Sequence, residues 1–142
     1  MDYFEELFEP MTEEEKAKKK ISKLALTSLG LKLNNSTFRF RTPSLHKMWI
    51  QGAFKKKLAA LVGQEYARLY TASAIKGIAK VYERVLGDKK GIDRKSASVA
   101  KELYDYLRRA LFTSATKVAS LADARGDADI KKAFRIMGEQ LR

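Results

Sequence analysis

The stretch SASVAKELYDYLRRALFTSATKVASLA, residues 96–122, decides the fold of this chain. Its apolar residues recur three or four positions apart, which is the spacing of one face of an α-helix. They are Val99, Leu103, Leu107, Leu111, Ala115, Val118 and Ala122. Ser96 stands at the start of the pattern, and Arg125-Gly126 interrupts it at the end. We therefore expect a helix of about seven turns, roughly 40 Å long.

Weaker helical patterns lie on both sides of this stretch. Thr12 and Glu15 are spaced as a capping box, and apolar residues follow at helical spacing as far as residue 29. Ser44 can cap a helix through residue 69, and further helices are indicated from about residue 72 to 86 and around residues 130–137. The alternation of residues 38–41 is too short to indicate a strand. The sequence predicts an all-α fold.

The charge is strongly positive and unevenly distributed. The 142 residues hold 29 Lys and Arg against 17 Asp and Glu, a net charge of +12. Residues 1–15 carry seven acids and no base, so the rest of the chain carries +19. Such a field attracts polyphosphate chains, in binding that weakens as salt rises. We expect a nucleic-acid-binding protein, and we expect residues 2–15 to fold back on the basic surface and weaken nonspecific binding.

Membrane and secretory roles are not indicated. No basic stretch carries a broad apolar face, and no apolar run approaches the roughly 18 residues of a membrane span. The acidic start, MDYFEELFEP, is unlike a secretory signal. We expect a protein that is not secreted and binds no membrane, located in the nucleus on chromatin or in a virion.

Catalytic chemistry is not indicated either. The chain has no Cys and a single His, His46, which we expect at the surface or in a helix cap. Asp123, Asp127 and Asp129 lack the later Glu of a calcium loop, and no Gly-rich phosphate loop is present. We expect a protein that is not an enzyme, with no metal, no cofactor and no small-molecule substrate.

From about residue 72 onward, a short helix, a basic loop, a long helix, a short loop and a short helix follow one another, which is typical of the histone fold. Lys80-Val81, Gly91-Ile92 and Lys95 resemble the core histone usually called two-B. Further matching residues lie in the last helix: Asp129-Ile130, Ala133, Arg135 and Gly138-Glu139. The resemblance covers residues 72–142, about half the chain, and fits a divergent histone of the kind that some large DNA viruses encode.

The resemblance implies a handshake dimer with a two-A-like histone chain or with a second copy. Its interface would bury Val99, Leu103, Leu107, Leu111, Val118 and Phe134. Alone, such a chain would self-associate or be partly molten. We expect a division into an acidic leader (1–15), a helical N-terminal extension (16–70) and, as the resemblance implies, a histone-fold domain (71–142).

The resemblance further implies that two loops grip double-stranded DNA by shape and charge. The candidate contacts are Lys89, Lys90, Arg94, Lys95 and Ser96 in the first loop and Arg125 in the second. Arg39 and Arg41 are further candidates; the interleaved Phe38 and Phe40 either anchor on the core, which we favour, or stack on single-stranded bases. The lysine triplets at 18–20 and 55–57 are interpreted as solvated faces that add diffuse attraction.

These observations predict a histone-like structural subunit that wraps or compacts duplex DNA in a nucleosome-like particle. Two alternatives stay open: a helical nucleocapsid coat protein of a DNA virus, and a histone-fold subunit of a transcription complex that serves protein contacts. The net charge speaks against the last of these.

Overall fold

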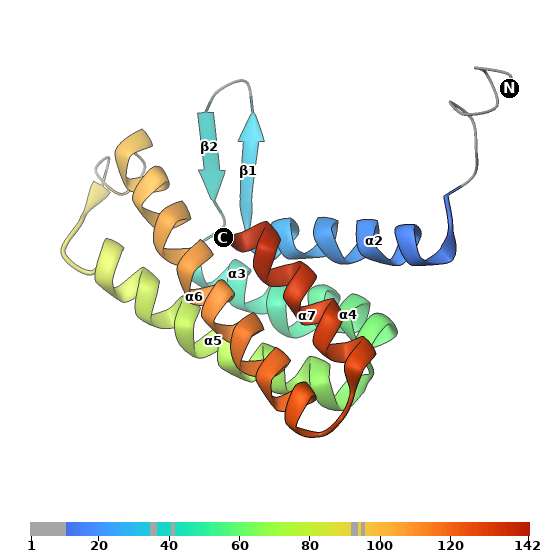
Figure 1. The fold of residues 1–142 in the computed structure, drawn as a ribbon. Coiled ribbons are helices and arrows are strands. Elements are labelled where there is room, and N and C mark those ends of the chain that lie inside the picture. Colours follow the sequence, from blue (N-terminus) through green and yellow to red (C-terminus); the bar gives the residue numbers. More distant parts are fainter. Residues whose placement is uncertain (1–10, 35–36, 41, 92–93, 95) are drawn as a thin grey trace, which may run out of the picture.

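The structure is a computed structural model that describes residues 11–34, 37–40, 42–91, 94 and 96–142, the residues of its two strands by their backbone alone. Its elements, in chain order (Figure 1), are α2 (Glu13–Thr27), β1 (Leu31–Asn34), β2 (Thr37–Phe40), α3 (Pro43–Trp49), the π-helical turn η1 (Ile50–Phe54), α4 (Lys55–Val62), α5 (Gln64–Leu86), α6 (Ala97–Ala124) and α7 (Ala128–Leu141). The prediction of a helical protein is confirmed, with a short hairpin as the departure.

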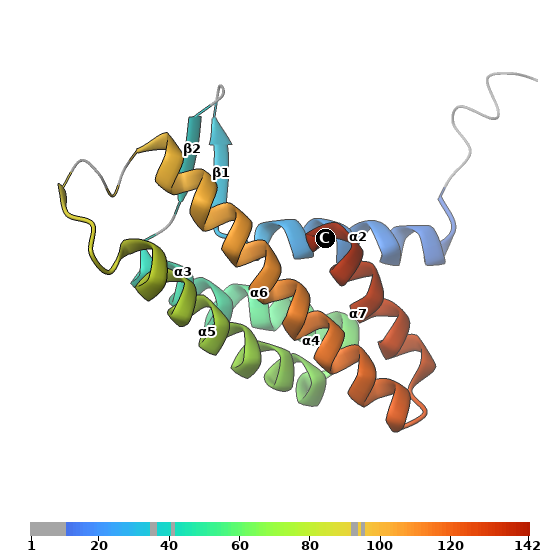
Figure 2. The ribbon, with the colours of Figure 1, turned by 60° about the vertical axis from the view of Figure 1, so that its left-hand side comes forward.

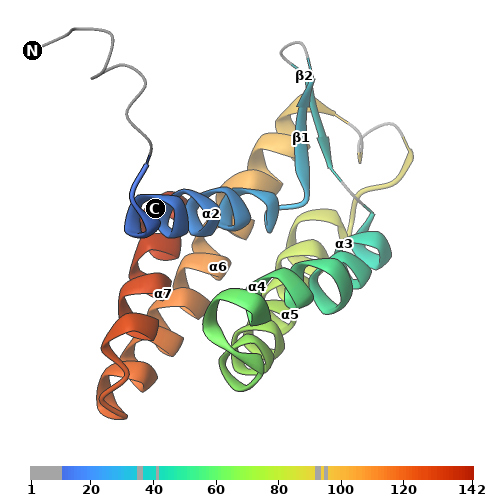
Figure 3. The same cartoon turned by 90° about the vertical axis from the view of Figure 1, so that its right-hand side faces the viewer.

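The three C-terminal helices form the body of the molecule. Figures 1 and 2 show α5, α6 and α7 packed side by side, each antiparallel to the one before it. The segment from α3 to α4 lies along the other side of α5, and α2 crosses the ends of α7 and α4 (Figure 3). The ring of Tyr70 on α5 lies 6.0 Å from that of Phe54 in η1 and 5.6 Å from that of Phe134 on α7. One hydrophobic core therefore joins the N-terminal and C-terminal helices.

The long helix α6 begins and ends as its sequence predicts. The Ser96 hydroxyl accepts a hydrogen bond from the Val99 N–H at 3.3 Å, which caps the first turn. At the other end Gly126 has a φ of +76°, and the Asp127 N–H donates to the Ala122 carbonyl at 2.9 Å. This is a Schellman turn, and it folds α7 back along α6.

The helix boundaries between residues 42 and 86 differ from the prediction. Helix α4 ends at Gly63, which has a φ of +87° that glycine adopts without strain. Helix α5 then runs without interruption across residues 70–72. Residues 70–72 contain no Gly or Pro, so nothing local ends a helix there. The expected boundary between residues 70 and 71 therefore falls inside α5, with core residues on both sides of it.

The start of α3 is also corrected. The predicted cap, Ser44, lies inside the helix, and the Thr42 hydroxyl accepts a hydrogen bond from the Leu45 N–H at 3.3 Å instead. Pro43 takes the first helical position, where its missing N–H costs nothing.

The hairpin is an element that the sequence does not predict. Strands β1 and β2 pair antiparallel, with Leu31 opposite Phe40 and Asn34 opposite Thr37. Each strand has only four residues, which is too few for a period-2 pattern to stand out. The hairpin rises beside the N-terminal half of α6 (Figure 1) and packs on it through β2.

His46 is fully buried, which corrects the expectation that it lies at the surface or in a cap. Its Nε2 donates to the Ser28 carbonyl oxygen at 2.7 Å, and its Nδ1 accepts from the Tyr82 hydroxyl at 2.9 Å. A carbonyl oxygen only accepts, so Nε2 must carry the hydrogen. A Cβ on Gly30 would lie 3.0 Å from the imidazole ring, so only glycine fits there. His46 thus joins the end of α2 to α3 and α5.

We expect Tyr82→Phe to lower the free energy of unfolding by about 1–2 kcal/mol, because it leaves the buried Nδ1 of His46 without the hydroxyl donor. Chemical denaturation followed by circular dichroism measures the change. Tyr106→Phe is the matched control, because the Tyr106 side chain is half-buried and its ring lies against the guanidinium groups of Arg84 and Arg109. Equal effects of the two substitutions would show that the His46 hydrogen bond contributes nothing.

Candidate nucleic-acid interface

The first-loop candidates lie between the end of α5 and the start of α6, and they are only partly free to bind an anion. Lys89 donates to the Glu102 carboxylate at 3.1 Å, so its charge is already partly neutralised. Lys90 and Arg94 are exposed, and Ser96 serves as the helix cap. Lys95 lies outside the described residues.

Arg125, the second-loop candidate, is held by neighbours in the chain. Its guanidinium lies 3.1 Å from the Glu65 carboxylate and 5.7 Å from the centre of the Tyr66 ring. The Tyr66 hydroxyl in turn donates to the Asp127 carboxylate, which raises the pKa of the tyrosine. These contacts fasten the turn between α6 and α7 to the start of α5, so a structural role accounts for Arg125.

The two loops are not brought together within the chain. They lie at opposite ends of α6, whose 28 residues span about 42 Å. Arg39 lies in β2, opposite Lys32 of β1 in the hairpin register. Arg41 lies outside the described residues. No joint site thus forms from the predicted contacts of one chain, among the residues that the structure describes.

The residues expected to form a dimer interface lie in the core of the single chain, which corrects that expectation. Leu103, Leu107, Leu111 and Phe134 are 0 % exposed, Val118 is 3 % and Val99 is 4 %. Helices α5 and α7 pack along α6 and cover its apolar stripe. The stripe therefore needs no partner chain to leave water.

The signal that the sequence interpretation missed is a long run without acids. Residues 16–64 contain 12 Lys and Arg and no Asp or Glu, which equals the net charge of the whole chain. The acidic leader and the excess of bases after residue 64 cancel one another. The net positive charge of the chain is therefore carried by α2, the hairpin and the segment from α3 to α4.

A first groove lies between α2 and α4 and is rimmed by lysines. Lys20 and Lys23 come from α2 and Lys57 from α4, around a floor that includes Leu24 and Leu61. Its volume is about 350 Å³. The Lys57 ammonium lies 5.3 Å from the centre of the Trp49 ring, which holds this side chain beside α3.

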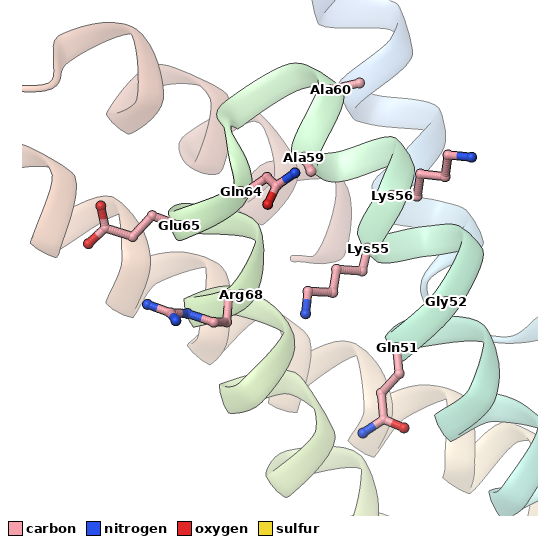
Figure 4. Close-up of a pocket in the computed structure, with 9 residues that line it drawn as sticks. All are labelled: Gln51, Gly52, Lys55, Lys56, Ala59, Ala60, Gln64, Glu65 and Arg68. Atoms are coloured by element: carbon pink, nitrogen blue, oxygen red, sulfur yellow. The ribbon is translucent and has the colours of Figure 1, made fainter.

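A second groove, of about 740 Å³, lies between α4 and α5 (Figure 4). Lys55 and Gln64 point into the space between the two helices, and Lys56 points away from α5. Arg68 and Glu65 extend on the other side of α5 in this view. Glu65 is the one acid along the described lining, and its carboxylate is paired with Arg125.

The geometry of a helix explains why one triplet serves both grooves. Successive residues of an α-helix are turned by about 100°, so three consecutive lysines spread over more than half of its circumference. Lys55 therefore lies on the α5 side of α4, and Lys57 on the α2 side. Ala60 lines both grooves, so they adjoin along α4.

We call Lys20, Lys23, Lys55, Lys56, Lys57 and Arg68 the basic face. Five of the six are exposed and Lys55 is half-buried. None of them forms an ion pair with any residue that the structure describes. Unneutralised like charges on adjoining grooves produce a local positive potential, which favours the binding of an extended anion.

The acids at the start of α2 form ion pairs outside the basic face. Glu13 pairs with Lys16, and Glu14 accepts a hydrogen bond from Lys132 on α7, which lowers the pKa of the Glu14 carboxyl. The acids of residues 2–9 lie outside the described residues. Glu13 and Glu14 thus pair with Lys16 on α2 and Lys132 on α7, and neither pairs with a lysine of the two grooves.

Among the described residues, no three His, Asp or Glu side chains are grouped so that they could hold a metal ion. No helix in the described ranges is both long and apolar enough to cross a membrane. Comparison with models of known protein families, with curated proteins and with solved structures finds no match.

Proposed function

We propose that this protein binds nucleic acid, duplex DNA in particular, through the basic face and without catalysing a reaction. The observation that carries the proposal is the gathering of six bases without ion-pair partners on two adjoining grooves. They belong to a sequence in which residues 16–64 hold no acid. Lysine and arginine contacts to phosphate supply most of the affinity of sequence-independent binding.

The side chains around the grooves favour a duplex over a single strand. Proteins that bind single strands place exposed aromatic rings beside the basic groove, so that bases stack on them. Among the residues whose side chains the structure describes, a set that does not include Phe38 and Phe40 of β2, no Phe, Tyr or Trp is exposed. A face of this kind contacts phosphates, and the duplex offers them at the higher density.

Packaging of DNA, in chromatin or in a virion, is the role that sequence-independent binding suits best. The proposal keeps the DNA-binding function that the composition predicts. It differs from the histone-like mechanism in two ways: the apolar stripe of α6 is part of the protein's own core, and the phosphate contacts come from α2, α4 and α5.

Fluorescence anisotropy with end-labelled duplexes tests the proposal. We expect two duplexes of equal length and unrelated sequence to bind the full chain with dissociation constants within about threefold, because phosphate contacts carry no sequence information. A single strand of the same length should bind more weakly. Absence of binding at 50 mM salt, or binding confined to one sequence, would contradict the proposal.

A further inference from the structure

The groove between α2 and α4 has two properties that phosphate contact does not explain together. Its rim carries three lysines, but its floor is largely apolar, formed by Leu24, Leu61, Ala60 and Thr27. A phosphate gains nothing from an apolar floor, whereas an aromatic or aliphatic side chain is stabilised by leaving water there. The best occupant is a segment that combines acidic and large apolar residues.

The chain itself contains such a segment. Residues 1–10, MDYFEELFEP, carry four acids and no base, together with four large apolar residues after the initial Met. The acids are Asp2, Glu5, Glu6 and Glu9, and the apolar residues are Tyr3, Phe4, Leu7 and Phe8. The acids of these ten residues are complementary to the cationic rim of the groove, and their apolar side chains are complementary to its floor.

The length of the segment allows it to reach the groove. Thr12 is the cap of α2, with an extended backbone (φ −66°, ψ 161°), so the helix begins at Glu13. Lys20 and Thr27 lie 8 and 15 residues beyond this cap, or about 12 and 22 Å along the axis of α2. Ten residues span up to about 33 Å when extended. The segment can therefore turn back and run along α2 to the groove.

We propose that residues 1–10 dock in the groove between α2 and α4, with their apolar side chains on its floor and their carboxylates beside Lys20, Lys23 and Lys57. Docking covers half of the basic face, so DNA and the segment compete for the same three lysines. The competition rests on the proposed function; the docking itself does not.

Cross-linking in the full-length chain tests the docking. The protein has no Cys, so a variant with Tyr3→Cys and Thr27→Cys holds the one pair of thiols in the molecule. The matched control is Tyr3→Cys with Leu26→Cys, because Leu26 is exposed and lies at nearly the same distance along α2, but does not line the groove. Under mild oxidation, we expect the first pair to form an intramolecular disulfide at least ten times faster than the control.

A second variant shows whether the apolar residues direct the docking. Adding Phe4→Ser, Leu7→Ser and Phe8→Ser to the Tyr3→Cys, Thr27→Cys chain should reduce the rate of disulfide formation to that of the control. Equal rates for the two cysteine pairs in the otherwise unchanged chain would overturn the docking. Disulfides formed mainly between two molecules would also overturn it, since they would place the segment on a second copy.

The competition is measured separately from the docking. In the cysteine-free chain, Phe4→Ser, Leu7→Ser and Phe8→Ser should tighten binding to duplex DNA at least threefold, because the three lysines become available. Cross-linking requires no nucleic acid, so it would persist if the protein failed to bind DNA. Selective cross-linking without any change in DNA affinity would confirm the docking and overturn the competition.

Discussion

Lys55→Glu, Lys56→Glu and Arg68→Glu together should weaken binding to duplex DNA by roughly 10²–10³-fold at 0.1 M salt. Each phosphate contact contributes about 0.9 to the slope of log K against log salt, which corresponds to nearly a factor of ten at this salt concentration. Loss of three contacts therefore lowers the binding constant by up to about a thousandfold, and the introduced carboxylates add repulsion. These residues line the groove between α4 and α5 and do not line the proposed docking groove, which adjoins it.

The matched control carries the same change of charge on other parts of the molecule. Lys80→Glu, Lys101→Glu and Lys117→Glu alter three exposed lysines of α5 and α6 that line neither groove. Long-range repulsion alone should weaken its binding by less than about tenfold, since charges beyond a Debye length of about 10 Å are screened. Equal losses in the two variants would contradict a localised face and favour a diffuse cationic surface.

Leu107→Ala should lower the free energy of unfolding by about 3–4 kcal/mol. Leu107 is 0 % exposed on α6, and truncating its side chain leaves a cavity in the hydrophobic core. Leu26→Ala is the control; Leu26 is 47 % exposed, and the change should cost less than about 0.5 kcal/mol. Urea denaturation followed by circular dichroism measures both changes.

The same experiment distinguishes a core residue from an interface residue. The full chain should sediment as a monomer, and its unfolding midpoint should not depend on protein concentration. If Leu107 lay at a handshake interface, the midpoint would rise with concentration, and Leu107→Ala would weaken association. A concentration-dependent midpoint would thus restore the histone-like dimer.

The elements that could be predicted from the sequence are those fixed by local residues. The stripe of α6 runs without interruption, Ser96 supplies its cap and Gly126 its end, so α6 and α7 were predicted nearly as they are. The boundary between α4 and α5 was missed because a helical glycine and a helix-ending glycine look alike in sequence. Gly52 lies in η1 with nothing within 4 Å of its missing Cβ, whereas Gly63 turns the chain through a positive φ.

The roles of the α6 stripe and of His46 depend on burial and on neighbours in space, which the sequence alone does not show. Whether the α6 stripe faces a second chain depends on how α5 and α7 pack, which no local pattern states. The same holds for His46, whose role depends on Ser28 and Tyr82, far away along the chain.

The candidate site could be predicted only as a total charge. The sequence alone indicates only a solvated face for the lysine triplet at 55–57, because it does not show that α2 and α5 lie on either side of α4. A count of acids along the chain points to the right region, since none occurs between residues 16 and 64. The pairing of Arg125 with Glu65 shows the opposite case. Arg125 lies in a loop that the sequence indicates as a DNA contact, but its charge is neutralised by a residue 60 positions away.

The salt dependence of DNA binding tests the central claim most directly. If the six bases of the basic face each contact a phosphate, log K against log salt should have a slope of about −5 for the full chain. Lys55→Gln, Lys56→Gln and Arg68→Gln should reduce the slope to between about −2 and −3, with no dependence on DNA sequence. The same slope for the variant and the unchanged chain would show that these residues do not contact phosphate, and would contradict the account.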